Sequence, residues 1–161
     1  MSPKRVLFVC TGNSCRSVMA QGLMQHALRQ AGIKTVTVES AGVFAISGMG
    51  PTRETQKVLQ EAIGVDCSEH RARTLTPEMV QAADLVFVME QFQAEEVLRR
   101  VPSAKDKVHL LKPYGLAKEE AGNCPNIPDP IGKPLEVYEV CFAEIRDAID
   151  RIAKSLGVAS V

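Results

Sequence analysis

The stretch VLFVCTGNSCRS, residues 6–17, joins two patterns of different period. Lys4 to Val9 is a short run rich in β-branched and apolar residues, which is typical of a strand buried on both faces. Gly12 and Asn13 bound this run on its C-terminal side. From Ser17 onward the apolar residues recur at helical spacing, and Gly32 marks the end of that helix. A strand that leads through a short loop into a helix is the first half of an α/β unit.

The rest of the chain repeats this alternation of strands and helices. Further strands are expected at 34–39, 84–89 and 107–111. Further helices are expected from Pro51 or Thr52 to Ile63, from Thr76 to Ala83, over 91–100 and over 135–156, with loops at 41–50 and from 112 to Lys133. The alternation predicts an α/β fold, a three-layer sandwich with a parallel sheet and right-handed crossovers. Ligands of such sheets bind at the carboxyl ends of the strands, which is where the 10–17 loop lies.

Length and composition narrow the class of protein. We expect the 161 residues to form one domain, 1–161. The nineteen basic and nineteen acidic side chains cancel, so we expect neither nucleic acid nor a membrane as a partner. No apolar run is long enough to span a bilayer, and the basic start lacks the features of a signal peptide, so we expect a cytoplasmic protein. The five scattered cysteines include no C-x-x-C pair, which argues against structural zinc.

The loop from Cys10 to Ser17 has the chemistry of an anion site. Backbone N–H groups at the start of a helix and the positive end of its dipole favour a bound phosphate. Arg16 adds a planar guanidinium suited to tetrahedral oxyanions. The same groups favour the thiolate of Cys10, and Ser17 could donate a hydrogen bond to it, so Cys10 is the candidate nucleophile. The loop lacks the Gly-Lys-Ser/Thr end of a P-loop and the G-x-G-x-x-G of a dinucleotide site.

The run Ile127-Pro128-Asp129-Pro130 supplies a candidate general acid. Two prolines stiffen the backbone on either side of Asp129, so its carboxyl group is held in one place. A D-P turn on its own is common in surface loops. Together with the C-x5-R-S loop, it favours Asp129 as the proton donor for a leaving group.

C-x5-R-S near the N-terminus and D-P far downstream resemble the low-molecular-weight protein-tyrosine-phosphatase family. The resemblance extends to SAG at 40–42, HRAR at 70–73 and DLVFVM at 84–89. It implies a four-stranded parallel sheet flanked by helices, with a phosphate-binding loop after the first strand. It also implies a phosphorylated protein as substrate, inhibition by phosphate or vanadate, and no metal or other cofactor.

The resemblance also assigns roles to individual residues. It implies that Cys10 attacks phosphorus to give a phosphocysteine, that Arg16 holds the oxygens, and that Asp129 protonates the leaving group and then activates water. It further implies that Asn13 adopts a left-handed conformation, held by hydrogen bonds from Ser17, Ser40 and His70. The phosphate would be bound by the remaining loop residues, namely Thr11, Gly12, Asn13, Ser14, Cys15 and Ser17.

Two readings of Cys15 stay open at this point. It could be a small residue at the start of a helix. It also matches a cysteine of the family, and a disulfide with Cys10 would then shelter the nucleophile from irreversible oxidation. Cys67, Cys124 and Cys141 are expected to take no part in the chemistry, with Cys141 in the core.

The pocket residues Ser14, Phe44 and Ile131 bear on the substrate. The tyrosine-directed members have a bulky aliphatic residue at position 14 and aromatic residues after D-P, whereas this chain has Ser14 and Ile131. SAGVFA and a small hydroxyl residue at position 14 resemble the bacterial protein-arginine phosphatases, which have threonine there. We favour phosphoarginine, and phosphotyrosine is the alternative. Arsenate reduction would need further cysteines, which residues 80–93 lack, and a non-catalytic phosphate-binding module is a further alternative.

Overall fold

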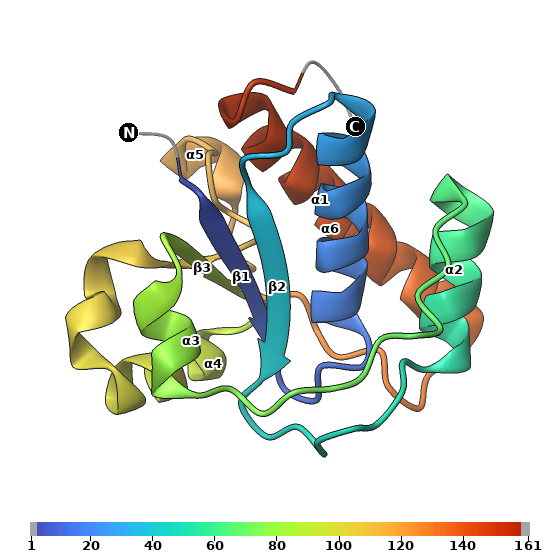
Figure 1. Ribbon diagram of the computed structural model, residues 1–161, viewed down its shortest axis with the longest axis horizontal. Coiled ribbons are helices and arrows are strands. Elements are labelled where there is room, and N and C mark those ends of the chain that lie inside the picture. Colours follow the sequence, from blue (N-terminus) through green and yellow to red (C-terminus); the bar gives the residue numbers. More distant parts are fainter. Residues whose placement is uncertain (1–2, 159–161) are drawn as a thin grey trace.

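The computed structural model describes residues 3–158, which fold around one parallel sheet (Figure 1). The strands are β1 (Arg5–Cys10), β2 (Thr37–Gly42), β3 (Leu85–Val88) and β4 (Val108–Leu110), in the order β2-β1-β3-β4. All three strand pairs are parallel, so the four carboxyl ends lie at the same edge of the sheet. The predicted four-stranded parallel sheet is confirmed.

Helices cover both faces of this sheet. They are α1 (Arg16–Gln30), α2 (Arg53–Ile63), α3 (Pro77–Ala82), α4 (Gln91–Arg100), α5 (Lys118–Ala121) and α6 (Leu135–Ser155), with a 3-10 helix at Pro102–Lys107. Side chains of β1 alternate between the two faces: Val6 and Phe8 pack in one core with α1, α2 and α6, whereas Leu7 and Val9 pack in a second core with α3 and α4. The result is the three-layer arrangement seen in Figure 1.

Two parts of the sequence prediction differ from the structure, namely the bounds of the second strand and the long loop before Lys133. The second strand was expected at 34–39 but runs over Thr37–Gly42, three residues later. Pairing with β1 sets these bounds, because Thr37 faces Arg5 and Gly42 faces Cys10. The stretch expected to be one long loop before Lys133 contains the short helix α5, and the 3-10 helix precedes β4. Neither element is long enough to produce a recognisable periodic pattern.

Local signals at the helix ends agree with the structure. Thr76 caps α3 by accepting a hydrogen bond from the backbone N–H of Met79, and Pro77 follows it at the first helical position. Gly32 has a φ of 70° just beyond the end of α1, a left-handed conformation that favours glycine. Along residues 3–158, no helix combines the length and apolar character needed to cross a bilayer.

Candidate active site

The loop between β1 and α1 holds Cys10 at its base. The side chain is buried, and its Sγ lies 3.0 Å from the Oγ of Ser17, in the first turn of α1. The backbone fixes this placement, because Cys10 pairs with Gly42 as the last residue of β1. Residue 42 has to be small there, since an added Cβ would lie 2.5 Å from the carbonyl oxygen of Thr11. The sheet and the helix therefore place the thiol beneath the start of α1.

Arg16 is the first residue of α1, next to Ser17, and its side chain is almost completely buried. Its Nη1 donates to the carbonyl oxygen of Ile127 at 2.7 Å and to the carboxylate of Glu90. Its Nη2 donates to Thr11 Oγ1 at 3.4 Å. Within the described chain, the buried Nε has no hydrogen-bond partner. A buried N–H without a partner is costly, and a tetrahedral oxyanion in the loop would satisfy it.

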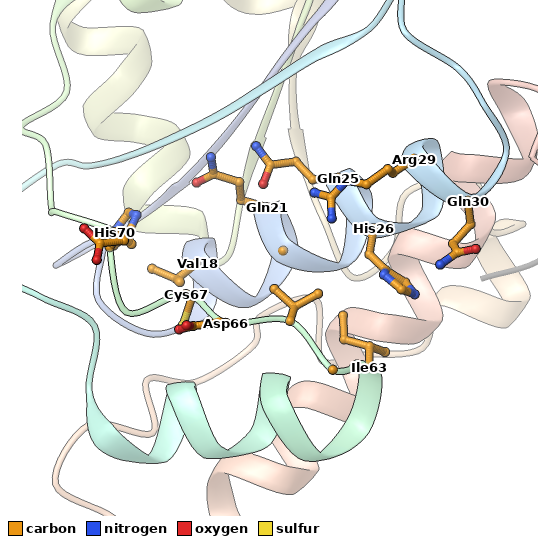
Figure 2. Close-up of a pocket in the computed structure, with 14 residues that line it drawn as sticks. Val18, Gln21, Gln25, His26, Arg29, Gln30, Ile63, Asp66, Cys67 and His70 are labelled. Atoms are coloured by element: carbon orange, nitrogen blue, oxygen red, sulfur yellow. The ribbon is translucent and has the colours of Figure 1, made fainter.

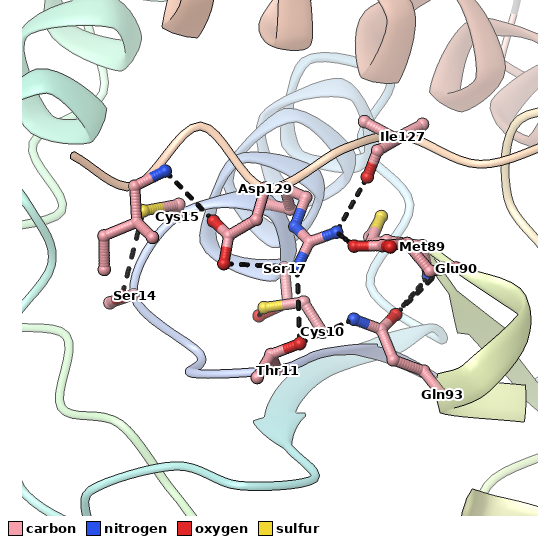
Figure 3. Close-up of polar contacts among 12 residues, drawn as sticks. Cys10, Thr11, Ser14, Cys15, Ser17, Met89, Glu90, Gln93, Ile127 and Asp129 are labelled. Atoms are coloured by element: carbon pink, nitrogen blue, oxygen red, sulfur yellow. Dashed lines mark hydrogen bonds and ion pairs between the residues drawn. The ribbon is translucent and has the colours of Figure 1, made fainter. Parts of the chain in front are cut away.

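Asp129 lies on the opposite side of the loop from β1, where the segment after Ile127 crosses the site (Figure 3). Its Oδ2 is 3.6 Å from Arg16 Nη2, and its Oδ1 accepts a hydrogen bond of 3.1 Å from the backbone N–H of Ile131. The side chain is 36% exposed, so water and a substrate can reach it. The structure thus brings together the three residues that the sequence analysis placed in catalytic roles, although Cys10 and Asp129 are 119 positions apart in sequence.

Asn13 holds the loop in its strained shape. Its φ is 54°, the one left-handed conformation adopted by a residue other than glycine between residues 3 and 158. Its amide Nδ2 donates to Ser17 Oγ at 2.7 Å and to Ser40 Oγ at 2.9 Å, so the two hydroxyls accept these bonds. Its carbonyl oxygen accepts from His70 Nε2 at 2.9 Å, and its Oδ1 accepts from the backbone N–H of Arg73 at 2.9 Å. Four bonds from separate segments fix the residue.

His70 is held in the neutral state by its surroundings. Burial lowers the pKa of His70 below its usual 6.5, and the nearby positive charges of Arg73 and Arg71 lower it further. The hydrogen bond to Asn13 acts in the opposite direction. Because a carbonyl oxygen can only accept, the neutral imidazole carries its proton on Nε2.

Cys15 directly precedes α1 and packs away from the base of the loop. Its Sγ lies 3.5 Å from Thr52 Oγ1, 3.5 Å from the hydroxyl oxygen of Tyr138 and 3.8 Å from Ser14 Oγ. Burial raises the pKa of Tyr138, so the phenol stays protonated and can donate. Both Cys10 and Cys15 are free thiols. The disulfide between them stays a prediction.

The other three cysteines lie outside the loop. Cys141 is buried in the core against α1, as expected, and burial raises the pKa of its thiol to about 12. Cys67 is half-buried and Cys124 is exposed. In the part of the chain that the structure describes, no cluster of His, Cys, Asp or Glu side chains could hold a metal ion.

Two polar residues at the start of α4 reach the loop and were missed by the sequence analysis. Glu90, just before the helix, forms the ion pair with Arg16. Gln93 is fully buried and donates from Nε2 to Thr11 Oγ1 at 3.0 Å, while its Oε1 accepts from the backbone N–H groups of Met89 and Glu90. The available signal was their position directly after a buried strand, where parallel sheets place ligand-contacting residues.

The pocket residues predicted from sequence lie at different depths. Ser14 is buried in the loop, whereas Phe44 and Ile131 are exposed. Phe44 is tied to the loop by its backbone N–H, which donates to the carbonyl oxygen of Thr11 at 3.0 Å. Ile131 follows Asp129 by two residues and donates to its carboxylate.

A cavity of about 700 Å³ lies between α1 and the segment that follows α2 (Figure 2). Cys10, Arg16 and Asp129 do not line it. His70 and Gln21 stand at its border, and Gln21 accepts a hydrogen bond from the hydroxyl of Ser40. The cavity therefore borders residues that support Asn13.

Comparison with known proteins agrees with this geometry. The family model described as low molecular weight phosphotyrosine protein phosphatase matches residues 5–160. A protein-arginine-phosphatase of Geobacillus stearothermophilus is 38% identical over 96% of this chain and 97% of its own length. A probable low molecular weight protein-tyrosine-phosphatase, EpsP of Ralstonia solanacearum, is 37% identical over 91% and 92% of the two chains.

A solved structure shows the same likeness in three dimensions. It is a YwlE arginine phosphatase mutant with a phosphorylated active-site serine, which superposes with a TM-score of 0.84 at 30% identity and covers 96% of this chain and 97% of its own. The fold, the cysteine loop and the match over nearly the whole chain lead to one conclusion. This chain belongs to the low molecular weight phosphotyrosine protein phosphatase family.

Proposed function

We propose that this protein is a cysteine-dependent protein phosphatase that removes phosphate from phosphoarginine side chains. Cys10 is the nucleophile, Arg16 binds the phosphoryl oxygens, and Asp129 is the general acid and base. The observation that carries the proposal is the buried Nε of Arg16, which has no partner within residues 3–158, in the same loop as a thiol that contacts the hydroxyl of Ser17. An oxyanion in the loop would satisfy the guanidinium and face the sulfur.

The reaction proceeds in two steps on this geometry. The thiolate of Cys10 forms an S–P bond as the P–N bond of phosphoarginine breaks, and Asp129 gives its proton to the departing nitrogen. Asp129, now a carboxylate, takes a proton from a water molecule that attacks the phosphocysteine. The S–P bond then breaks, which releases phosphate and returns the thiolate. Ser17 stabilises that thiolate with its hydroxyl, 3.0 Å from the sulfur.

The rest of the loop binds the phosphoryl group without a metal in this proposal. Backbone N–H groups of residues 11–17 and the Arg16 guanidinium supply positive charge directed at the developing charge on the oxygens. Asn13 fixes the directions of those N–H groups through its four hydrogen bonds. Phosphate and vanadate should compete with substrate for the same site.

Two observations support phosphoarginine over phosphotyrosine. Ser14 leaves room for a planar guanidinium and offers it a hydroxyl partner, and Ile131 supplies no aromatic wall for a phenyl ring. The similarity to an arginine phosphatase over 96% of the chain agrees with this choice. The similarity to a protein named as a probable tyrosine phosphatase makes phosphotyrosine the second candidate.

The proposal is tested in two stages. Wild-type protein should hydrolyse p-nitrophenyl phosphate, and Cys10→Ser should reduce turnover by far more than a hundredfold while still binding phosphate. Retention of activity by the serine variant would refute the covalent mechanism. Competition between phosphoarginine and phosphotyrosine peptides then decides the substrate.

A variant of Ser14 makes the substrate test sharper. Ser14→Ile narrows the opening and adds an apolar wall, so it should raise the ratio of phosphotyrosine to phosphoarginine turnover, by about 10- to 200-fold at most. The measurement is kcat/KM for both peptides in both proteins. A wild-type preference for phosphotyrosine, with an unchanged ratio in the variant, would replace the first candidate by the second.

A further inference from the structure

Exposed apolar side chains gather beside the catalytic loop. Seven large apolar side chains are strongly exposed in the described chain, and five of them lie on three segments that contact residues 10–17 or their partners. These five are between 42% and 67% exposed and are Phe44, Ile46, Met49, Phe92 and Ile131. We call them the apolar rim. The other two, Val137 and Val140, lie on α6.

Hydrogen bonds hold the first rim segment along one side of the loop. Backbone N–H groups at its two ends donate to the loop, from Phe44 to the Thr11 carbonyl at 3.0 Å and from Thr52 to the Ser14 carbonyl at 3.2 Å. Ile46 and Met49 lie between these two attachments and close a turn, in which the N–H of Met49 donates to the carbonyl oxygen of Ile46. The segment is therefore fixed beside the loop while its apolar side chains stay exposed.

The other two rim residues are fixed in the same way. Phe92 lies between Glu90, which pairs with Arg16, and Gln93, which donates to Thr11. Ile131 donates from its backbone to the carboxylate of Asp129. Both residues therefore lie within two positions of a residue that belongs to the site.

The ring of Phe44 has a charged neighbour within the protein. The guanidinium of Arg100 lies 5.9 Å from the centre of its ring. Arg100 is itself anchored, because it donates to the carbonyl oxygens of Val43 and Leu75 and pairs with Glu96. An exposed aromatic ring that is already ordered loses little entropy when a partner covers it.

We infer that the apolar rim binds the substrate chain on either side of the phosphorylated residue and favours apolar residues at those flanking positions. The inference rests on the proposed function, because a phosphorylated side chain that reaches Cys10 must bring its own backbone across the rim. Covering exposed apolar side chains with apolar residues of a substrate removes both from water, which is favourable. An apolar cluster next to a functional site is also the usual mark of a contact with another molecule.

The test uses two pairs of peptides, one pair with phosphoarginine and one with phosphotyrosine. Within each pair the phosphorylated residue is flanked either by leucines or by serines. Wild-type protein should show a higher kcat/KM for the leucine peptide, by about 5-fold or more. The double variant Ile46→Ser, Met49→Ser should lose most of this preference, chiefly through the leucine peptide. Val140→Ser, an equally exposed apolar site on α6, should retain it.

Binding of the same peptides to the Cys10→Ser protein separates this inference from the proposed function. Calorimetry should give a lower Kd for the leucine peptide, and the rim substitutions should abolish the difference. Equal Kd values for the two peptides would overturn the inference about the apolar rim. A loss of preference in the Val140→Ser control as large as in the rim variant would overturn it too. Absence of hydrolysis by wild-type protein, with the difference in binding intact, would instead overturn the proposed function.

Discussion

Replacement of Glu90 by glutamine or alanine should cost this protein both stability and activity. Its carboxylate pairs with Arg16, whose side chain is 1% exposed, while that of Glu90 is 23% exposed. Glutamine keeps an oxygen that can accept from Arg16 Nη1 but loses the charge. Alanine removes both, and leaves Nη1 with only its 2.7 Å bond to Ile127.

The magnitude follows from the burial of the two partners. Removing one partner of a fully buried ion pair costs about 3–5 kcal/mol, whereas an exposed pair contributes about 0–1 kcal/mol. Partial exposure of Glu90 and the retained bond to Ile127 place Glu90→Ala between these limits, at about 1–3 kcal/mol. Glu90→Gln should cost less. Because displacement of a catalytic group by about 1 Å can reduce a rate about 100-fold, kcat/KM of the alanine variant should fall by about that factor.

The assay combines urea unfolding with kcat/KM for p-nitrophenyl phosphate. Glu61→Gln is the matched control, because Glu61 forms an exposed ion pair with Lys57 far from the loop and should change neither quantity appreciably. A Glu90→Ala protein with reduced stability but wild-type kcat/KM would show that the ion pair does not position Arg16. Unchanged values of both quantities would refute the energetic reasoning itself.

Three further predictions concern the acid, the second loop cysteine and pH. Asp129→Asn should slow hydrolysis by about 10²–10⁴-fold when the leaving group needs a proton, and much less when the leaving group departs as a stable anion. Equal loss of rate with both kinds of substrate would assign Asp129 a structural role. Mild peroxide should inactivate the enzyme reversibly through a Cys10–Cys15 disulfide. Tyr138→Phe should speed this oxidation, because it removes the hydroxyl that contacts the Cys15 thiol. Peptide mapping that finds Cys15 as a free thiol and Cys10 overoxidised would contradict this prediction. Because the pKa of His70 is lower in the folded state than its usual 6.5, the unfolded chain binds the proton more readily. The free energy of unfolding should therefore fall as pH drops below about 6.5. An identical pH dependence of that free energy in His70→Gln would exclude this cause.

The fold was predictable from the sequence because its signals are local and agree with one another. The apolar run ending at Cys10 and the 84–89 run read as buried strands, and the loop at 10–17 lies between a strand and a helix, as observed. The shift of β2 to Thr37–Gly42 was not predictable from residues 34–42 alone, since the bounds of that strand depend on which residues face β1.

Within the site, residue type sufficed for some members and only contact revealed the others. Cys10 and Arg16 stand six positions apart within one loop, and Asp129 stands between two prolines, so the sequence alone indicated candidate roles for all three. Glu90 and Gln93 were not, because a glutamate or glutamine at the start of a helix is ordinarily a solvent-exposed residue. The parallel pairing of β1 and β3 is what turns them toward Arg16 and Thr11.

The sequence by itself thus indicated the alternation of the main strands and helices, the loop at 10–17 and Cys10 as the candidate nucleophile, because backbone periodicity and side-chain chemistry are properties of short segments. Only the tertiary structure showed the other distant groups that support that loop, beyond the Ser40 and His70 that the family resemblance implied. The backbone of Arg73 reaches Asn13 from sixty positions away, and Tyr138 reaches Cys15 from the last helix. Such contacts depend on how helices pack on the two faces of the sheet, and no local pattern encodes that packing.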